Sequence, residues 1–299
     1  MKKVAIVISA YNQERLLRAC LISLQKTDYK DYKIFLVDDS GSKKIGQKIK
    51  KDFKGIDITS TKGWSGFSKV YNIGAKKALE NYKPDYVLLL NDDTEIINKN
   101  WLSKMIEAGE SDEKIGILGV KLIYQNNNIQ NIGGYIKKWE ITKEMAENKK
   151  DVFEVDHVMG AFMLIKKQVL DKIGLLDEIY NPYLLEDTDY CLTAKEKGFR
   201  IVSVPFVEII HKKGKTIDTK PSPERMAVRF KNDIFFSRRH LKGWNKFFRI
   251  FIFLPMVAVF RKSTDEDELK FKNFRLRKGF LINISLWIRA LVYNLFKIK

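Results

Sequence analysis

Three pairs of acidic residues lie where a chain of this pattern could do chemistry. Asp38–Asp39 follow the apolar run "IFLV", Asp92–Asp93 follow "YVLLL", and Glu186–Asp187 open the segment "EDTDYC". Carboxylates gathered in one place repel each other unless a cation joins them. A Mg²⁺ or Mn²⁺ ion would do so, since Mg²⁺ is usually held by one or two protein carboxylates together with phosphate oxygens.

The first hundred residues alternate between apolar runs and amphipathic segments, and this alternation positions two of the acidic pairs. Near-continuous apolar runs separated by helices predict an α/β fold, a Rossmann-like, mostly parallel sheet with helices on both faces. Ligands bind such sheets at the carboxyl ends of the strands, so the first two pairs should converge on one crevice. Strands are predicted at 4–11, 32–39, 56–61 and 86–90, and helices at 13–27, 43–53 and 68–82.

The pattern of apolar residues changes twice in the rest of the chain. Residues 115–165 contain several strand-like runs with Asn- and Gly-rich turns, followed by two short helical segments and a last strand near 199–205. After residue 220, an apolar stretch at 246–260 is broken by Pro255, and residues 280–296 carry apolar side chains at helical spacing. Neither apolar stretch reaches the ~20 uncharged residues of a membrane-spanning helix.

Charge is concentrated in the C-terminal third. The chain of 299 residues has a formal net charge of +18, and residues 212–299 hold 22 Lys and Arg against 7 Asp and Glu. Such asymmetry indicates an anionic partner, nucleic acid or a lipid surface. No stacking-aromatic module or reading helix supports nucleic acid, so an anionic membrane surface bound by an interfacial helix at 280–296 is the interpretation we favour. The alternative is packing against the catalytic domain or a second copy of the chain, in a homodimer.

The two cysteines exclude a disulfide framework or a cysteine metal site. Cys20 has leucines at helical spacing around it and is predicted to lie in the core, and a reducing compartment is expected. The first apolar run, of about seven residues, is too short for a signal peptide and predicts a strand.

Taken in order, these motifs resemble the GT-A glycosyltransferases of family 2. The motifs are "SAYN", "VDDSGS", "NDDTE" and "EDTDYC", with "GFSKVYNIGAKKAL" and "GLLDEIYNPYLLEDTDYCLTAKEKGF" between and around them. The resemblance covers roughly residues 3–240, and the block from Gly160 to Phe199 looks most like the rhamnosyltransferase-type branch. It implies a GT-A domain at 1–220, with a nucleotide-sugar-binding half at about 1–98 and an acceptor half at about 99–220. A basic, amphipathic helical region would follow at 221–299.

The resemblance also implies roles at the donor side. Asp39 corresponds to the residue that recognises the nucleobase, and the backbone of Ala10–Tyr11 would flank that base. Asp93 would bind the metal, with Asp92 supporting it or contacting the ribose. Asn91 replaces the first acid of the family's Asp-any-Asp motif, so His211 is a candidate to complete the metal shell.

At the acceptor side, Asp187 matches the general base that takes the proton of the attacking hydroxyl. Glu186, Gly160 and His157 are candidates for supporting or acceptor-binding roles. The implied activity is inverting transfer of a hexose or deoxyhexose from a UDP- or dTDP-sugar, with Mn²⁺ or Mg²⁺. The acceptor would be a glycan or lipid-linked precursor of cell-surface polysaccharide or glycoconjugates, and the protein would be cytoplasmic and peripheral on the inner face of the membrane.

Plainer interpretations remain open for each motif. "VDDSGS" could be an Asx turn, "NDDT" a helix cap, and "LEDTD" an acidic first turn that matches a helix dipole. Asn72 and Gly74 are expected to fix helix packing rather than to contact substrate. A sugar-nucleotide pyrophosphorylase is a rival, but "SAYNQERLL" lacks the phosphate-binding glycines that it and a dinucleotide oxidoreductase would need. A catalytically inactive membrane-surface scaffold also stays open because of Asn91.

Overall fold

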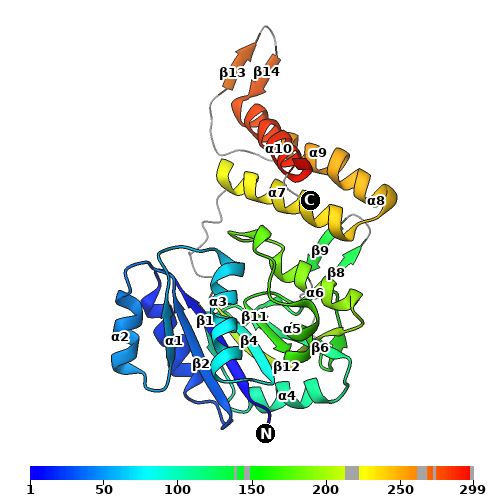
Figure 1. The fold of residues 1–299 in the computed structure, drawn as a ribbon. Coiled ribbons are helices and arrows are strands. Elements are labelled where there is room, and N and C mark those ends of the chain that lie inside the picture. The colour runs from blue at the N-terminus through cyan, green and yellow to red at the C-terminus, as the bar shows by residue number, and fades with distance from the viewer. Residues whose placement is uncertain (138–139, 145–148, 213–221, 261–267, 272–273, 297–299) are drawn as a thin grey trace. The chain divides into compact units, whose positions relative to one another are not determined.

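The computed structural model describes residues 1–137, 140–144, 149–212, 222–260, 268–271 and 274–296 (Figure 1). The chain divides into two compact units. The first, the sheet unit, consists of Met1–Ile136, Thr142–Pro182 and Glu186–Thr216. The second, the helical unit, consists of Lys137–Ile141, Tyr183–Leu185 and Ile217–Lys299. The predicted boundary near residue 220 falls within 213–221, outside the described residues.

A ten-stranded sheet forms the sheet unit, in the order β10-β12-β6-β11-β4-β1-β2-β3, with β5 paired to β12 and β7 to β6. The strands β1, β2, β3, β4, β6 and β12 run in one direction, whereas β11 lies antiparallel between β4 and β6. The bounds are β1 Val4–Ala10, β2 Tyr32–Asp38, β3 Asp57–Ser60, β4 Tyr86–Asn91, β5 Thr94–Ile96, β6 Ile115–Ile123, β7 Ile129–Asn131, β10 Phe153–Glu154, β11 Phe162–Lys166 and β12 Arg200–His211. A separate two-stranded sheet pairs β8 Gly134–Lys137 with β9 Glu140–Glu144.

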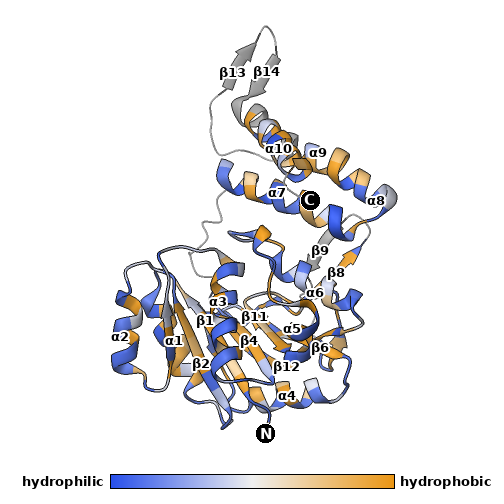
Figure 2. Cartoon of the chain, in the orientation of Figure 1, coloured by the Kyte–Doolittle hydropathy of each residue, from blue (hydrophilic) through white to orange (hydrophobic). Residues whose placement is uncertain are grey.

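Helices cover both faces of the sheet, as the apolar runs predict. Alternate residues of β1 enter two different cores: Val4, Ile6 and Ile8 pack with α1, α2 and α4, and Ala5 and Val7 pack with α3. Figure 2 shows hydrophobic residues concentrated in the strands. The helix bounds are α1 Glu14–Leu24, α2 Lys44–Asp52, α3 Phe67–Asn81, α4 Trp101–Glu110, α5 Lys167–Ile173 and α6 Glu186–Glu196, with a 3₁₀ turn at Glu178–Tyr180. The predicted α/β class with a mostly parallel sheet is confirmed.

Close packing explains the Gly and Asn residues of α3. A Cβ on Gly74 would lie 2.3 Å from Cγ1 of Val7, so this position lets α3 approach β1 closely. Asn72 donates a hydrogen bond from Nδ2 to the carbonyl of Leu176 (2.9 Å) and accepts one from the amide of Leu176 (3.1 Å). Both residues therefore hold the packing, as predicted. Cys20 is likewise fully buried in the core, and burial raises the pKa of its thiol to about 12.

The helical unit is built on α7 Pro223–His240, α8 Gly243–Phe248, a π-helical turn at Arg249–Phe253, α9 Leu254–Phe260 and α10 Lys278–Phe296, with a hairpin of β13 Glu268–Phe271 and β14 Phe274–Arg277. Its core joins α7, α9 and α10 through residues such as Phe230, Leu254 and Ala290. The apolar stripe predicted on the last helix is split: Ile284 and Leu291 pack against this core, whereas Leu295 is 59% exposed. Among the described residues, none of the helices combines the length and hydropathy of a membrane span.

Candidate active site

Sheet topology brings the predicted site residues to one edge. In the registers of β1 with β2 and β4, Ala10 pairs with Asp38 and Ser9 pairs with Asn91, so these strands end level with one another. The strand β11 runs the opposite way and begins at this edge, where the amide of Asn91 donates to the carbonyl of Ala161 (3.0 Å). The predicted convergence of the acidic strand ends is therefore present.

The two acids after β2 have different surroundings. Asp38 is fully buried, and its carboxylate accepts hydrogen bonds from the amides of Ser40 (3.1 Å) and Gly46 (2.8 Å), which fixes the start of α2. Asp39 is 3% exposed and accepts from Oγ1 of Thr61 (2.6 Å) and from the amide of Ser65 (2.7 Å). Oδ1 also accepts from Oγ of Ser65 (2.8 Å). Asp39 thus holds the loop that follows β3, and its Oδ2 keeps lone-pair capacity for a ligand N–H.

An aromatic pair beside Asp39 was missed by the sequence interpretation. The rings of Tyr11 and Trp64 lie with centroids 6.0 Å apart, and Trp64 is 51% exposed. Trp64 belongs to the loop that Asp39 anchors, between Gly63 and Gly66, which both have positive φ. The sequence did offer one signal for Trp64, a large aromatic residue in a short Gly-flanked loop near a strand end. Exposed rings of this kind can stack on a base.

Asp93 and His211 lie together although 118 positions separate them in the chain. Oδ1 of Asp93 is 3.2 Å from Nε2 of His211, and both residues are 7% exposed. Pairing of β5 with β12 sets this contact, since Thr94 is the register partner of His211 and the amide of Lys212 donates to the carbonyl of Asp93 (2.9 Å). Nδ1 of His211 lies 3.0 Å from Oε1 of Gln130, which orients the imidazole ring.

This pair fits a divalent cation that also binds a ligand. A carboxylate oxygen and an imidazole nitrogen on a hydrogen-bonded ring are donors that Mn²⁺ accepts. Across the described residues, no three His, Cys, Asp or Glu side chains are grouped to hold a metal. A cation here would therefore need further oxygen ligands from water or phosphate, which is usual for Mg²⁺.

The neighbouring side chains of Asn91 and Asp92 have different surroundings. The side-chain oxygen of Asn91 accepts a hydrogen bond from the buried hydroxyl of Tyr71 (2.9 Å). Asp92 is part-exposed in the turn between β4 and β5, and burial together with the charge of Asp93 raises its pKa to about 8. Two adjacent carboxyl groups that raise each other's proton affinity form an arrangement that a bound cation would stabilise.

Asp187 lies in the first turn of α6, and its carboxylate is held in one orientation. Its Oδ2 accepts a hydrogen bond from the amide of Gly160 (2.8 Å), and its Oδ1 accepts from the amide of Thr188 (2.6 Å). Gly160 is two residues before β11, so this contact brings Asp187 to the edge that carries Asn91 and Asp93. A Cβ on Gly160 would lie 2.8 Å from Cζ of Phe67, which explains a glycine here.

The two remaining candidates are buried. His157 is 4% exposed, forms a backbone bridge with Gly134, and has its pKa lowered by burial. Glu186 is 6% exposed in the first turn of α6. Both lie next to the Asp187–Gly160 contact in the chain, so they are placed to support it.

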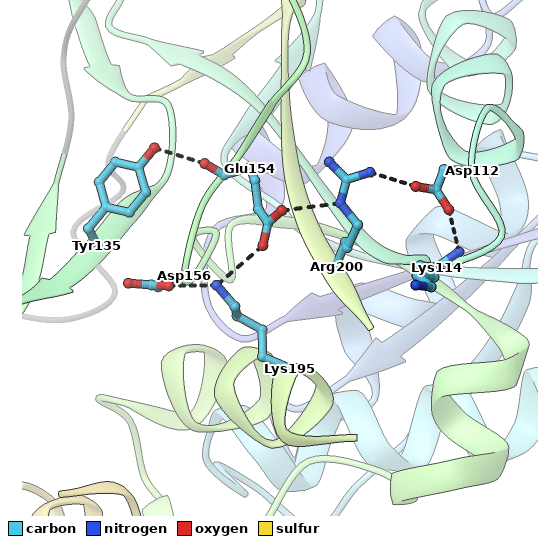
Figure 3. A network of polar contacts seen from close by, with 7 residues as sticks. All are labelled: Asp112, Lys114, Tyr135, Glu154, Asp156, Lys195 and Arg200. Carbon is cyan, nitrogen blue, oxygen red and sulfur yellow. Dashed lines mark hydrogen bonds and ion pairs between the residues drawn. The ribbon is translucent and has the colours of Figure 1, made fainter. Parts of the chain in front are cut away.

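A polar network anchors the far end of α6 (Figure 3). Lys195 pairs with Asp156 (2.7 Å) and Glu154 (3.5 Å), and Nε of Arg200 pairs with Glu154 (3.1 Å). Nη1 of Arg200 reaches Asp112 (2.5 Å). The network thus ties the helix that carries Asp187 to β10 and β12, away from the site edge.

Comparisons with known proteins support the resemblance to family 2 glycosyltransferases. Residues 5–174 match the family described as Glycosyl transferase family 2. A GalNAc(5)-diNAcBac-PP-undecaprenol beta-1,3-glucosyltransferase of Campylobacter jejuni is 25% identical over 67% of this chain and 62% of its own length. The Low-salt glycan biosynthesis hexosyltransferase Agl10 of Haloferax volcanii is 26% identical over 59% of this chain and 57% of its own length. The chain thus spans less than two thirds of these curated relatives.

Solved structures share the fold. GalNAc-T7 with UDP, GalNAc and Mn²⁺ superposes with a TM-score of 0.68 at 16% identity, over 86% of this chain and 51% of that one. TarS 1-349 of S. aureus in complex with UDP-GlcNAc gives 0.63 at 17% identity, over 97% and 79%. These neighbours confirm the predicted GT-A architecture, while the rhamnosyltransferase-type branch stays a prediction.

Proposed function

The chain belongs to glycosyl transferase family 2, and on that premise we propose that it transfers a sugar from a nucleoside diphosphate sugar to an acceptor hydroxyl with inversion. The observation that carries the proposal is the held carboxylate of Asp187, which the Gly160 amide keeps at the sheet edge that also carries Asp39 and the Asp93–His211 pair. A base, a nucleotide-recognising acid and a metal-binding pair at one edge are the parts that such a transfer needs.

The donor nucleotide would bind at the ends of β1 and β2. Asp39 would accept the imide N–H of a uracil or thymine ring, the group that a UDP- or dTDP-sugar presents. The Ala10–Tyr11 backbone would flank the base, and we add Trp64 as an aromatic contact because its half-exposed ring faces that of Tyr11. The hydrogen bonds from Thr61 and Ser65 would keep the Asp39 carboxylate in place for this contact.

Asp93 and His211 would hold Mn²⁺ or Mg²⁺, with Asp92 supporting the site or contacting the ribose. A bound divalent cation stabilises the negative charge that develops on a departing diphosphate. His211 supplies the ligand that Asn91 does not, and Gln130 keeps its ring oriented. Asn91 itself is held by Tyr71 and leaves the site with one formal negative charge fewer than an Asp-any-Asp motif would have.

Asp187 would act as the general base in a single displacement. Its carboxylate takes the proton of the acceptor hydroxyl while that oxygen forms a bond to the anomeric carbon. The bond between this carbon and the β-phosphate oxygen breaks, and its electron pair leaves with the nucleoside diphosphate. Attack from the face opposite the leaving group inverts the configuration. Gly160, Glu186 and His157 would position Asp187 or line the acceptor side.

The acceptor would be a glycan or a lipid-linked precursor of cell-surface polysaccharide or glycoconjugates, and the transferred group a hexose or deoxyhexose. Support comes from the Campylobacter jejuni relative, whose name includes GalNAc(5)-diNAcBac-PP-undecaprenol, a lipid-linked glycan. The concentrated positive charge of residues 212–299 suits a peripheral position on the anionic inner face of the cell membrane.

A panel of nucleotides in a thermal-shift assay tests the donor site. UDP and dTDP should raise the melting temperature in the presence of Mn²⁺, GDP should raise it less, and the metal-dependent part should vanish in Asp93→Asn. If no nucleotide shifts the transition with metal present, the donor site is not where we place it. Binding without any sugar transfer to prenyl-linked or soluble glycan acceptors would instead favour an inactive scaffold.

A further inference from the structure

Phe67 is the first residue of α3, and its backbone is held on both sides. Its amide donates a hydrogen bond to the carbonyl of Pro182 (2.7 Å). Two residues earlier, Ser65 donates to the carboxylate of Asp39 from its amide (2.7 Å) and from its hydroxyl (2.8 Å). Gly66 lies between them with a φ of 85°, and a Cβ there would lie 2.9 Å from Cα of Pro182. A short, tightly held segment therefore links Phe67 to the acid that would bind the nucleobase.

The ring of Phe67 packs against the residue that holds the proposed general base. A Cβ placed on Gly160 would lie 2.8 Å from Cζ of Phe67 and 3.4 Å from Oδ2 of Asp187, so the ring and the carboxylate meet at the same face of Gly160. The amide of Gly160 donates to this same carboxylate oxygen (2.8 Å). Phe67 thus limits the movement of Gly160, and with it the movement of the carboxylate that Gly160 holds.

The same ring also packs against Tyr71, with the two ring centroids 4.5 Å apart. The hydroxyl of Tyr71 lies 2.9 Å from the carbonyl oxygen of Leu90 and 2.9 Å from Oδ1 of Asn91. These two residues end β4, directly before the turn that carries Asp93. Phe67 is therefore in contact with the residue that fixes the strand end beside the proposed metal site.

We propose that Phe67 is a positioning residue for sugar transfer, which sets the carboxylate of Asp187 relative to a donor held at Asp39 and Asp93. The inference rests on the proposed function, since it takes Asp187 as the base. Phe67 acts through its neighbours and not on the reacting atoms. Every residue in these contacts belongs to the sheet unit. A misplacement of about 1 Å in a site of this kind can lower the rate about 100-fold.

Steady-state kinetics of the full chain test the inference, with a radiolabelled UDP- or dTDP-sugar that the wild type transfers. Phe67→Ala should lower kcat about 100-fold. The KM for the donor and the affinity for UDP should stay close to wild type, because the backbone amide of residue 67 still bonds to Pro182. Phe67→Leu keeps an apolar side chain against Gly160 and should recover most of kcat. Loss of UDP affinity together with kcat would mean that Phe67 only maintains the fold of the site.

Phe199→Ala is the matched control. A Cβ on Gly116 would lie 3.0 Å from Cδ1 of Phe199, so this ring packs on a glycine much as Phe67 does. Phe199 precedes β12 and Gly116 is near the start of β6, at the end of the strands opposite the site. Phe199→Ala removes the same ring and should lower the melting temperature while kcat stays unchanged. Equal losses of kcat in the two variants would overturn the inference.

A double variant tests the contact itself. Gly160→Ala places a methyl group 2.8 Å from the ring tip of Phe67 and should lower kcat by displacing the residue that holds Asp187. In a chain that already carries Phe67→Ala the methyl group has room, so Gly160→Ala should then have little further effect. Residues in contact show such non-additive effects, whereas independent sites add. Additive losses would overturn the contact as the cause.

Hydrogen exchange of the Gly160 amide gives a reading that does not depend on sugar transfer. Phe67→Ala should speed this exchange by loosening the bond to Asp187, and Phe199→Ala should leave it unchanged. If the wild type transfers no sugar, the proposed function fails, and the exchange measurement still decides whether Phe67 holds this contact. Unchanged exchange in Phe67→Ala would overturn the positioning role even if kcat falls.

Discussion

In the sheet unit, the carboxylates of Asp38, Asp39 and Asp187 each accept hydrogen bonds from backbone N–H groups, whereas in the helical unit Nη1 of Arg238 is buried with no acceptor among the described residues. The acids of the first unit thus have fixed orientations before any ligand binds. The helical unit instead carries a row of exposed rings, those of Trp244, Phe247 and Phe251, in a basic part of the chain. These features are the basis on which we propose a reaction at the first unit and association with a membrane surface for the second.

This contrast has a basis in the local structure. Strand ends and helix starts offer N–H groups that carry no partner of their own, so an acid placed there is held by backbone geometry. A helix interior such as that of α7 offers no such free groups, so a charged side chain there is held by an oppositely charged one, as Asp233 of α7 pairs with Arg249 of the π-helical turn. Substitutions in the two units should therefore affect different measurements.

The largest expected effect is that of Asp187→Asn. Loss of a positioned general base typically lowers the rate by about 10²- to 10⁴-fold, while the hydrogen bonds to Gly160 and Thr188 can be retained in part by the amide. Sugar transfer measured with radiolabelled donor should fall by this factor, and nucleotide affinity in calorimetry should stay close to that of the wild type. Loss of nucleotide binding as well would mean that Asp187 only maintains the fold of this edge.

The second prediction concerns His211 and Asn91. His211→Ala should lower Mn²⁺ affinity, measured by calorimetry in the presence of UDP, by at least the roughly tenfold cost of losing an outer-shell partner. The double variant His211→Ala with Asn91→Asp should recover part of the lost Mn²⁺ affinity. A carboxylate at position 91 restores an acid to the site and can still accept the hydrogen bond from Tyr71. His240→Ala, in the helical unit, is the matched control. Identical affinities in wild type and His211→Ala would remove His211 from the metal site.

Trp64 tests the aromatic contact that the structure adds to the donor site. Stacking of a base on an aromatic side chain contributes roughly 1–3 kcal/mol, so Trp64→Ala should weaken UDP binding by about 5- to 150-fold. The maximal rate at saturating donor should change far less, because Trp64 would contact the base and not the reacting atoms. If affinity is unchanged, the exposed ring belongs to another partner.

The sequence predicted those site residues whose place in the fold follows directly from the pattern of apolar strands and helices. Asp39 and Asp93 were found because each follows an apolar strand, and parallel strands bring their carboxyl ends to one edge. Trp64 was missed because its loop is placed by hydrogen bonds from Thr61 and Ser65 to Asp39, which no periodicity reveals. The orientation of α10 could not be predicted either, since one apolar stripe packs against the core at Leu291 and is left exposed one turn later, at Leu295.

That orientation changes how membrane binding should be tested. Deletion of 280–299 would remove Ala290 and Leu291 from the core of the helical unit, so loss of vesicle binding after deletion would only report unfolding. Trp244→Ser removes an exposed ring instead and should weaken vesicle flotation several-fold while the UDP thermal shift stays unchanged. Trp64→Ala should give the reverse pattern. If both variants change both measurements, the hypothesis that the sheet unit binds nucleotide and the helical unit binds membrane is wrong.

The smallest expected effect is that of Arg200→Gln in the network of Figure 3. Hydrogen bonds from the amide of Lys114 and from Arg200 lower the pKa of Asp112 below its usual value. A carboxyl whose folded pKa is depressed adds stability above its unfolded pKa and loses it as the pH falls through the folded value. Arg200→Gln should therefore lower the melting temperature slightly at neutral pH, and the difference from wild type should shrink in acid, as read by circular dichroism. A gap that stays constant down to acidic pH would mean that Arg200 stabilises through packing and not through its charge.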